Sequence, residues 1–516
     1  MKESSLKNIV FLTSSIFILL CIILGIVSPS TFERVATQLF SFTTDYFGWF
    51  YLLSIFTIVV FLIALAFSKY GSIRLGGKDA RPEFKFLSWI AMLFSAGLGI
   101  ALVFWGVAEP MSHFFDTPFN DVEAMTPEAA RLAMGYSFFH WGISQWSVYA
   151  IMGLVMAFMQ FNKKKDLLIS TALEPVTGTN RALKNTIDIL AVIATVMGVA
   201  TSIGLGVLQT NGGLNAVFGT PISVWVQLII IAIMFVGYML SSTTGLHTGI
   251  RILSNVNMSL AMLLLLFVFV TGPTVFILET FTLALGDYIT HFIEYSLRLQ
   301  PYVDGTWVKD WTIFYWAWAI AWSPFVGAFV ARVSKGRTIR EFIIGVLIIP
   351  PLISCFWIAT FGGTAIYFDL NAGTNIAEAV NTDLTVALFQ MLEQLPLTMV
   401  ASIIGILLIF TFLITSADSA TYMMASMTSN GALNPRNRVK IVWGVLMAAI
   451  SSVLLFTGGL DALQTASLIS ALPFTIIVLL LIVSFVKMLR HEMVPISKRD
   501  IKRLKKMREY IENEKK

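Results

Sequence analysis

Twelve apolar segments, each about 20 residues long, constrain the fold of this chain more than any other feature of its sequence. About 20 residues of helix are needed to cross the hydrocarbon core of a bilayer. With 57% hydrophobic and 13% charged residues, the chain is also far from the soluble average of about 25% charged residues. We therefore predict an all-α integral membrane protein with twelve transmembrane helices. They are placed near 8–28, 48–68, 86–107, 133–160, 186–208, 222–240, 252–278, 311–331, 341–362, 396–416, 438–457 and 466–486.

The charges of the connecting loops predict the orientation of the chain in the membrane. Lys and Arg accumulate in the cytoplasmic loops of membrane proteins. They cluster after the segments at 48–68, 133–160 and 311–331, whereas the loops after 86–107 and 341–362 are acidic. This alternation supports the count of twelve helices and predicts that both termini are cytoplasmic.

A tryptophan-rich stretch at 314–325 marks a candidate binding site. Trp is usually concentrated at the two membrane interfaces, but this stretch lies within an apolar segment. Trp318 and Trp322 are four residues apart, which places both on one face of a helix. We expect this stretch to bind a ligand that contacts aromatic faces.

Two of the apolar segments are expected to be interrupted. Ser323 and Pro324 follow the tryptophans, and Pro releases backbone hydrogen bonds. Gly97 and Gly99 lie in a small-residue run, 95–101, within the third segment. Paired discontinuous helices of opposite direction indicate an inverted-repeat secondary transporter, although close packing of small residues is the alternative for the glycines.

Consecutive hydroxyl residues, Thr415 and Ser416, end the tenth segment. Hydroxyls in membrane helices often bond back to a carbonyl four residues earlier. Beside a broken helix they also offer hard oxygen ligands to a small cation. We therefore predict Na⁺ as the coupling ion, with no organic cofactor.

Three aromatic residues in the fourth segment could line one wall of a cavity. Trp141, Trp146 and Tyr149 fall within an arc of about 140° if the helix is continuous. The side chains of such a stripe usually pack in the protein core. A second Trp-rich helix, in membrane segments that contain almost no acidic residue, favours an aromatic site for a quaternary ammonium group instead.

Several stretches of the sequence resemble the betaine/choline/carnitine transporter family. They are 138–141, 314–325, 331–342 and 415–419. The resemblance covers the chain from its first helix to its tail and commonly implies a homotrimer. It also implies a leucine-transporter-type five-plus-five inverted repeat, formed by helices 3–7 and 8–12 and preceded by two extra helices. The corresponding divisions are 1–85, the first repeat at 86–280, an outer segment at 281–310, the second repeat at 311–486, and a tail at 487–516.

The resemblance also implies which residues bind substrate and ion. The implied substrate residues are Trp141, Trp146, Tyr149, Trp318, Trp322, Gly97 and Gly99. The implied sodium ligands are the backbone of Ser95, Leu98 and Phe412 and the side chains of Thr415 and Ser416, with a second site near Phe325. Family members commonly have a further Trp where this chain has Ala319, so the aromatic box is expected either to be wider here or to be completed by another ring.

Together these features predict a sodium-coupled symporter for a trimethylammonium compatible solute, foremost glycine betaine. The only ionisable residues expected near the membrane interior are His140 and Asp418, near the ends of their helices, and Glu109, just outside the third segment. Their scarcity argues against a proton pathway. A choline or carnitine transporter, proton-coupled or exchanging without an ion, is the alternative. The sequence contains no charged ring or carbonyl filter of a channel and no catalytic motif of an enzyme.

Two further segments predict surface interactions. The basic tail from Lys487 contains eleven Lys and Arg against five Asp and Glu, so it carries +6 in a chain whose net charge is +5. The rest of the chain is nearly neutral, which predicts contact of the tail with anionic lipid at the plasma membrane and does not imply nucleic acid. By resemblance, residues 498–516 are expected to sense osmotic stress, with a solvated tail as the alternative. Residues 280–300 have an aromatic stripe, which indicates either an interfacial helix on the outer surface or an ordinary loop helix.

Overall fold

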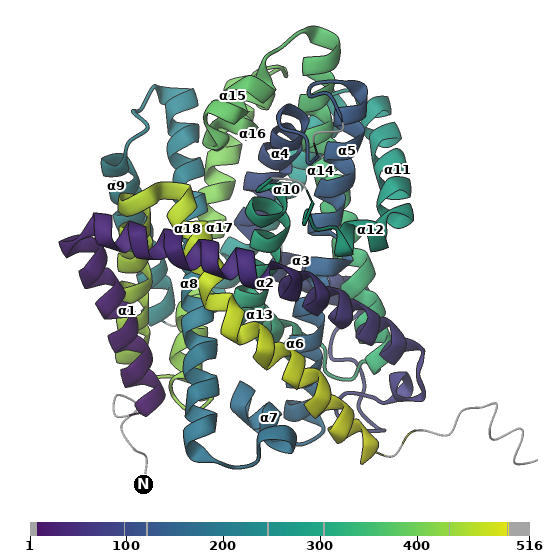
Figure 1. The fold of residues 1–516 in the computed structure, drawn as a ribbon, viewed down its shortest axis with the longest axis vertical. Helices are drawn as coiled ribbons and strands as arrows, with labels where there is room; N and C mark the ends of the chain where they lie inside the picture. Colours follow the sequence, from purple (N-terminus) through teal and green to yellow (C-terminus); the bar gives the residue numbers. More distant parts are fainter. Residues whose placement is uncertain are drawn as a thin grey trace, which may run out of the picture.

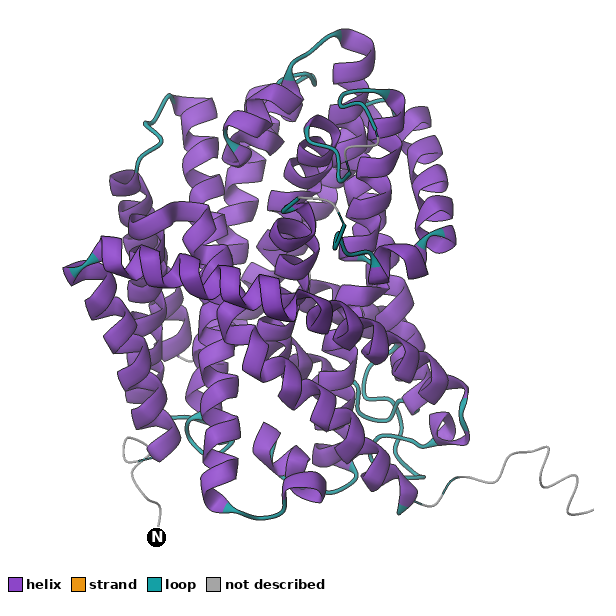
Figure 2. Ribbon diagram, viewed as in Figure 1, coloured by secondary structure: helices purple, strands orange, loops and turns teal. Residues whose placement is uncertain are grey.

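The computed structural model is built almost entirely of helices (Figure 1, Figure 2). It describes residues 8–97, 99–119, 122–244, 247–302, 305–432, 434–492 and 494, and for residues 94–97, 244 and 247–252 it describes the backbone only. Within these ranges the only β-structure is one isolated antiparallel bridge between Arg74 and Thr338. The described residues contain 10 helical stretches that are long and apolar enough to cross a membrane.

The helices follow one another along the chain with short connections. They are α1 (Ile9–Val27), α2 (Pro29–Phe67), η2 (Lys69–Ser72), α3 (Phe86–Gly97), α4 (Gly99–Phe115), α5 (Pro127–Trp141), α6 (Ile143–Phe161), α7 (Ile169–Thr177), α8 (Arg181–Phe218), α9 (Val224–Thr244), α10 (His247–Thr271), α11 (Thr274–Thr290), α12 (Phe292–Leu297), η3 (Lys309–Ile313), α13 (Phe314–Val333), α14 (Ile339–Ala372), α15 (Ile376–Thr382), η4 (Leu384–Val386), α16 (Ala387–Leu392), α17 (Thr398–Met427) and α18 (Asn437–Arg490).

Each predicted apolar segment lies on one or more of these helices. The third segment corresponds to α3 and α4, which lie on either side of Leu98, a residue outside the described ranges. The last two segments both lie on α18, which has 54 residues. Gly458 and Gly459 inside α18 have non-helical backbone angles, and the φ of 55° at Gly459 is in the left-handed region that favours glycine. The pairing of the helices into two inverted repeats stays a prediction.

Helix α2 is longer than the segment predicted at 48–68. It begins at Pro29 and has 39 residues, about 58 Å at 1.5 Å per residue. A bilayer core is only about 30 Å thick. Figure 1 shows α2 running obliquely across the bundle, so its added N-terminal turns extend along the surface.

The interruption predicted at Ser323 and Pro324 is wrong. Helix α13 continues through both residues to Val333. The Ser323 hydroxyl donates a hydrogen bond to the carbonyl of Ile320 at 2.8 Å. The helix therefore accommodates a single proline, and the irregular backbone lies before it, in the π-helical turn η3.

The fourth predicted helix is broken instead, at Gly142. This residue has φ −84° and ψ −150° and separates α5 from α6. A Cβ atom at Gly142 would lie 2.4 Å from the hydroxyl oxygen of Tyr288, so only glycine allows this approach. The Tyr288 hydroxyl in turn accepts a hydrogen bond from the backbone N–H of Ile143 at 2.9 Å. Because the helix is not continuous, the single arc predicted for Trp141, Trp146 and Tyr149 is wrong.

The aromatic stripe predicted at 280–300 faces protein. Tyr288 and Tyr295, on α11 and α12, are buried. The Tyr295 ring stacks on Tyr136 of α5 with 4.1 Å between the ring centroids. Asp287 pairs with Arg131 of α5 at 2.6 Å. These contacts hold α11 and α12 against α5.

The two ends of the described chain lie on the same side as loops with which they were predicted to share the cytoplasm. The side-chain amide of Asn8 donates to Asn430, in the loop after α17, at 2.9 Å. Lys163, in the basic loop after α6, pairs with Glu492 after α18 at 2.6 Å. Which side of the membrane this is stays a prediction, and residues 498–516 lie outside the described ranges.

Helices from both halves of the chain pack together around one hydrophobic core. Helix α13 packs along α6, α14 along α4, and α18 along α8. This packing brings the tryptophan-rich α13 against α6, where two more of the predicted aromatic residues lie. Trp146 and Tyr149 on α6 therefore lie on a helix that packs along the helix of Trp318 and Trp322.

Candidate substrate and ion sites

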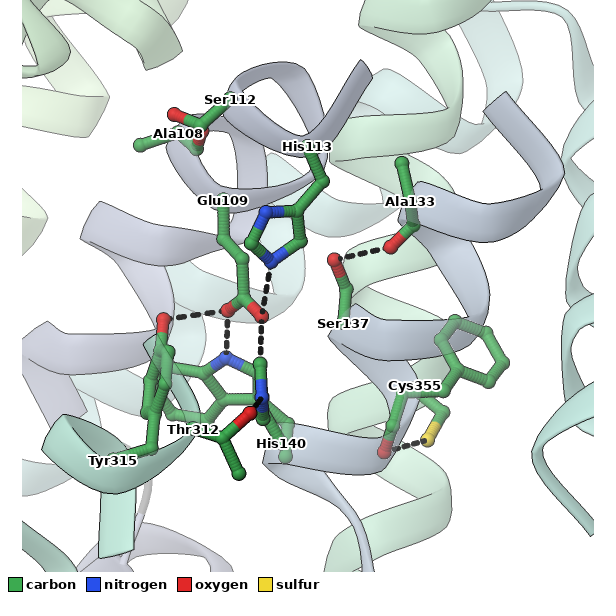
Figure 3. Close-up of polar contacts among 12 residues, drawn as sticks. Ala108, Glu109, Ser112, His113, Ala133, Ser137, His140, Thr312, Tyr315 and Cys355 are labelled. Carbon is green, nitrogen blue, oxygen red and sulfur yellow. Dashed lines mark hydrogen bonds and ion pairs between the residues drawn. The ribbon is translucent and has the colours of Figure 1, made fainter. Parts of the chain in front are cut away.

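Glu109 lies at the centre of a buried polar cluster (Figure 3). Its carboxylate accepts a hydrogen bond from His140 Nδ1 through Oε1 at 2.7 Å. Its other oxygen, Oε2, accepts from the indole Nε1 of Trp141 at 2.7 Å and from the hydroxyl of Tyr315 at 2.5 Å. The prediction that Glu109 lies just outside a helix ending near residue 107 is wrong, because α4 continues to Phe115 and Glu109 is fully buried within it.

The donors around Glu109 make its burial possible. A buried carboxylate is unfavourable by several kcal/mol unless its oxygens are hydrogen-bonded. Since a carboxylate only accepts, we assign the proton on His140 to Nδ1. Nε2 of the same ring then accepts from the Thr312 hydroxyl at 2.9 Å. The cluster thus joins α4 and α5 of the first half of the chain to η3 and α13 of the second.

Trp141 and Trp318 belong to one aromatic wall. The rings of Trp141 and Tyr315 are 5.7 Å apart at 74°, and those of Tyr315 and Trp318 are 6.3 Å apart. Phe314 stacks on Trp318 at 5.6 Å and 11°. Tyr315 connects the two predicted tryptophans, although it was not predicted as a site residue.

The other predicted aromatic residues form two separate groups. Trp146 and Tyr149 pack edge to face at 5.6 Å. Trp322 packs edge to face on Phe325 at 5.2 Å. Among the described residues, neither group makes a ring contact with Trp141 or with Trp318. The structure therefore divides the predicted aromatic box into three parts.

The indole N–H groups distinguish these parts further. Nε1 of Trp322 donates to the carbonyl of Gly198 on α8 at 3.0 Å, and Nε1 of Trp141 is held by Glu109. Nε1 of Trp146 and Nε1 of Trp318 are both buried without a hydrogen-bond partner. A buried donor without an acceptor is unfavourable, and a polar ligand would supply the acceptor.

Three of the predicted ion ligands, Phe412, Thr415 and Ser416, lie on α17 where it meets α4. A Cβ atom on Gly99 would lie 3.6 Å from the Ser416 hydroxyl oxygen and 3.9 Å from the ring of Phe412. The Thr415 hydroxyl donates to the carbonyl of Phe412 at 2.9 Å and accepts from the side-chain amide of Asn257 at 3.0 Å. Gly99 is thus close to the predicted ligands of α17.

The structure describes the remaining predicted ligands of this site only in part. Leu98 is not described, and only the backbone of Ser95 and Gly97 is described. Their roles stay predictions. The predicted second site lies near Phe325 on α13, and the ring of Phe325 is half-buried.

Comparison with known proteins places the chain in a family. The model of the betaine/carnitine/choline family of transporters matches residues 9–494. The chain belongs to this family. It is accordingly a multi-pass membrane transporter and not an enzyme, as predicted.

Individual members of the betaine/carnitine/choline family are similar over almost their whole length. The ectoine/hydroxyectoine transporter of Virgibacillus pantothenticus is 61% identical over 489 residues, which cover 95% of this chain and 98% of the relative. The glycine betaine transporter OpuD of Bacillus subtilis (strain 168) is 48% identical over 94% of this chain and 93% of its own. The glycine betaine/proline/choline/ectoine transporter of Vibrio parahaemolyticus is 40% identical over 95% and 88%, respectively.

Proposed function

We propose that this member of the betaine/carnitine/choline family is a sodium-coupled symporter that takes up zwitterionic compatible solutes for osmoprotection. The observation that supports the substrate site is that two of the predicted substrate residues, Trp146 and Trp318, have buried indole N–H groups without acceptors. A carboxylate on the solute would accept from them. The aromatic faces around Trp318 would hold the cationic part of the same molecule.

Within this class we propose ectoine as the preferred solute and glycine betaine, the solute predicted from the sequence, as a second substrate. Ala319 is fully buried on α13 and offers a methyl group where family members commonly offer an indole. A trimethylammonium group is held best by several aromatic faces around it. The flat, delocalised cation of ectoine needs fewer faces, because it can stack on one ring. The relative with 61% identity is an ectoine/hydroxyectoine transporter, which supports this order.

For the coupling ion we propose Na⁺, bound where α4 meets α17. The oxygen atoms described there that could bind the ion are the carbonyl of Phe412 and the hydroxyls of Thr415 and Ser416. Hard oxygens from backbone and hydroxyl groups beside a helix end suit Na⁺ in transporters of this kind. Bound Na⁺ would neutralise the negative ends of these dipoles and hold α17 close to α4.

The buried cluster at Glu109 favours proton coupling as a second candidate. From the sequence we expected no ionisable group deep among the helices, which favoured sodium. In the structure, however, Glu109, His113 and His140 are all fully buried. The Glu109 carboxylate is nevertheless engaged by three donors. We therefore assign it to holding Trp141 in place rather than to carrying a proton.

Uptake into proteoliposomes tests the proposal. Radiolabelled ectoine and glycine betaine are offered under an inward Na⁺ gradient, under an equal K⁺ gradient, and under an inward proton gradient with K⁺ on both sides. Accumulation that requires Na⁺, with a lower KM for ectoine, is the expected result. Equal accumulation with K⁺, or accumulation driven by the proton gradient alone, would overturn the sodium assignment. Choline and carnitine are included as competitors, since a carrier for either would show them as the stronger inhibitors.

The oligomeric state and the role of the tail are proposed from the family resemblance. We propose a homotrimer and a tail that responds to osmotic stress through anionic lipid. About 1 kcal/mol for each basic residue near an anionic surface makes such binding strong enough to act as a switch. Deleting residues 498–516 should leave uptake intact but remove its increase at raised osmolality. Activation that survives the deletion would assign the sensor to another part of the chain.

A further inference from the structure

Three potential metal ligands converge beside the wall that contains Trp141. Glu109 and His113 are four residues apart on α4, which places them on one face of the helix. His140 approaches from the end of α5. The ligand atoms of the three side chains all lie within 4.8 Å of one another, and all three residues are fully buried.

His113 is the unexplained member of this group. Its Nε2 lies 3.4 Å from Glu109 Oε1 and so approaches only to ion-pair distance. Figure 3 draws this contact as a dashed line. Neither ring nitrogen of His113 has a hydrogen-bond partner, although the side chain is fully buried. A buried imidazole normally satisfies at least one nitrogen. Its Nε2 atom instead faces the carboxylate oxygen that also contacts His140.

We propose that Glu109 Oε1, His113 Nε2 and His140 Nδ1 form a binding site for a divalent transition-metal ion such as Zn²⁺. Two histidines and one carboxylate, with a fourth position left open, are a common ligand set for Zn²⁺. Ligands about 2.0–2.1 Å from a tetrahedral ion are about 3.3 Å from each other. The 3.4 Å between His113 and Glu109 matches this spacing. The 2.7 Å between His140 and Glu109 must lengthen by about 0.6 Å.

The surroundings already supply the outer partners that a metal site of this kind needs. The nitrogen of His140 that would not bind the metal contacts the Thr312 hydroxyl, and the second oxygen of Glu109 is held by Trp141 and Tyr315. Such partners fix the orientation of metal ligands. When the metal replaces the proton on His140 Nδ1, the proton resides on Nε2, and the Thr312 hydroxyl turns from donor to acceptor.

A pocket lies beside this site, and two indole rings of its lining pack against His113. It has a volume of about 260 Å³, and its lining includes Asp116, Asp310, Trp307 and Trp311. The rings of the two tryptophans pack on the His113 ring, at 4.9 and 4.4 Å between centroids. Two carboxylates at a pocket attract cations. Movement of either indole would bring His113 into contact with the pocket.

Bound Zn²⁺ would join α4 rigidly to α5 immediately before Trp141 and the break at Gly142. A transporter that alternates between conformations requires its helices to move against each other. We therefore expect Zn²⁺ to inhibit uptake, whichever solute and coupling ion the carrier uses.

Metal binding by the purified full-length chain tests the site without reference to transport. The protein is loaded with ZnCl₂, desalted, and its retained zinc measured, and Zn²⁺ affinity is determined by calorimetry. We expect about one Zn²⁺ per chain and a loss of affinity of about 10- to 100-fold in His113→Gln. His291→Asn is the matched control, because His291 lies at the end of α11, outside the cluster, and its variant should bind like the wild type. Equal affinity in His113→Gln and the wild type would overturn the proposal.

A second measurement uses the wild-type chain alone, so that a folding defect in the variant cannot decide the outcome. Co²⁺ bound by two histidines and a carboxylate in tetrahedral geometry gives visible absorption bands. We expect these bands in the wild-type protein and their loss when Zn²⁺ is added in excess. Absence of the bands, or bands typical of octahedral Co²⁺ that Zn²⁺ does not remove, would contradict the site.

Discussion

The indole of Trp141 donates its only hydrogen bond to the carboxylate of Glu109, across 2.7 Å and from a different helix. The same carboxylate oxygen accepts from Tyr315 on α13. A predicted substrate residue is therefore fixed by a charged group that the substrate need not touch. The position of Trp141 depends on the contact between α4, α5 and α13.

Replacing Glu109 by Gln should weaken substrate binding through the position of Trp141. The single amide oxygen of Gln cannot accept from all three donors, and its NH₂ group faces at least one of them. Hydrogen bonds to a charged group contribute about 1.5–3 kcal/mol, so the KM for ectoine should rise about tenfold or more. Uptake kinetics in proteoliposomes provide the measurement. Tyr315→Phe removes one donor and leaves the carboxylate, and should show a smaller rise; an unchanged KM in Glu109→Gln would contradict the positioning role.

Replacing Trp146 or Trp318 by Phe should affect binding more than stability. Each change removes an N–H group that has no acceptor in the protein and keeps an aromatic ring. We expect the KM to rise about five- to tenfold, which corresponds to about 1 kcal/mol for the lost hydrogen bond to the solute. Trp322→Phe is the matched comparison, because its N–H bonds the carbonyl of Gly198. That variant should lower the Tm instead, and the reverse pattern would remove Trp146 and Trp318 from the substrate site.

Replacing Ala319 by Trp should change the preference between solutes. The added indole supplies an aromatic face, which favours a trimethylammonium group, and it also fills space that the ring of ectoine would use. We expect the ratio of kcat/KM for glycine betaine to that for ectoine to rise about tenfold. Because Ala319 is fully buried, expression and Tm are measured alongside, and the ratio is taken within the same preparation. A ratio that stays constant would show that residue 319 does not select the substrate.

Removing the hydroxyls of α17 should reduce the affinity for Na⁺. In Thr415→Ala and Ser416→Ala, the Na⁺ concentration for half-maximal uptake should rise about tenfold, since each variant loses one oxygen ligand. Thr411→Ala is the control, because the Thr411 hydroxyl bonds to the carbonyl of Leu407 within the same helix. A shift of equal size in Thr411→Ala would indicate a general effect on α17 rather than loss of an ion ligand.

Replacing Gly142 by Ala should destabilise the junction of α5 and α6. The new methyl group would lie 2.4 Å from the Tyr288 hydroxyl, and crowding of this kind costs about 1–3 kcal/mol. Gly286→Ala on α11 is the matched control, because a Cβ atom there has no neighbour within 4 Å and Ala favours the helix. Thermal unfolding of both variants in detergent gives the comparison. A Tm for Gly142→Ala equal to that of the wild type would show that Tyr288 can move away.

The helical segments could be predicted from the sequence because the hydrophobic thickness of a bilayer sets their length. The breaks could not be predicted in the same way. Pro324 lacks one N–H but remains inside α13, whereas Gly142, which has no special sequence context, lies at a real break. A tertiary contact allows the break at Gly142. The hydroxyl of Tyr288, which is far away in the sequence, accepts the hydrogen bond that the backbone N–H of Ile143 would make in a continuous helix.

In the candidate site, too, features of local sequence could be predicted, whereas contacts between distant segments could not. The tryptophans were found because Trp is unusual inside an apolar segment. Glu109 and Tyr315 were missed as a pair, since nothing local connects a carboxylate on α4 with a phenol on α13. The spacing of Glu109 and His113 on one helix was the available signal for the cluster. His140 joins them only through the packing of α5 against α4.

The most direct test of the central claim is equilibrium binding of ectoine to the purified protein, with and without Na⁺, followed by tryptophan fluorescence. We expect saturable quenching that requires Na⁺, is not supported by K⁺, and is strongly reduced in Trp318→Phe. Quenching of equal affinity in K⁺, or quenching that Trp318→Phe leaves unchanged, would contradict a sodium-coupled solute site between α6 and α13.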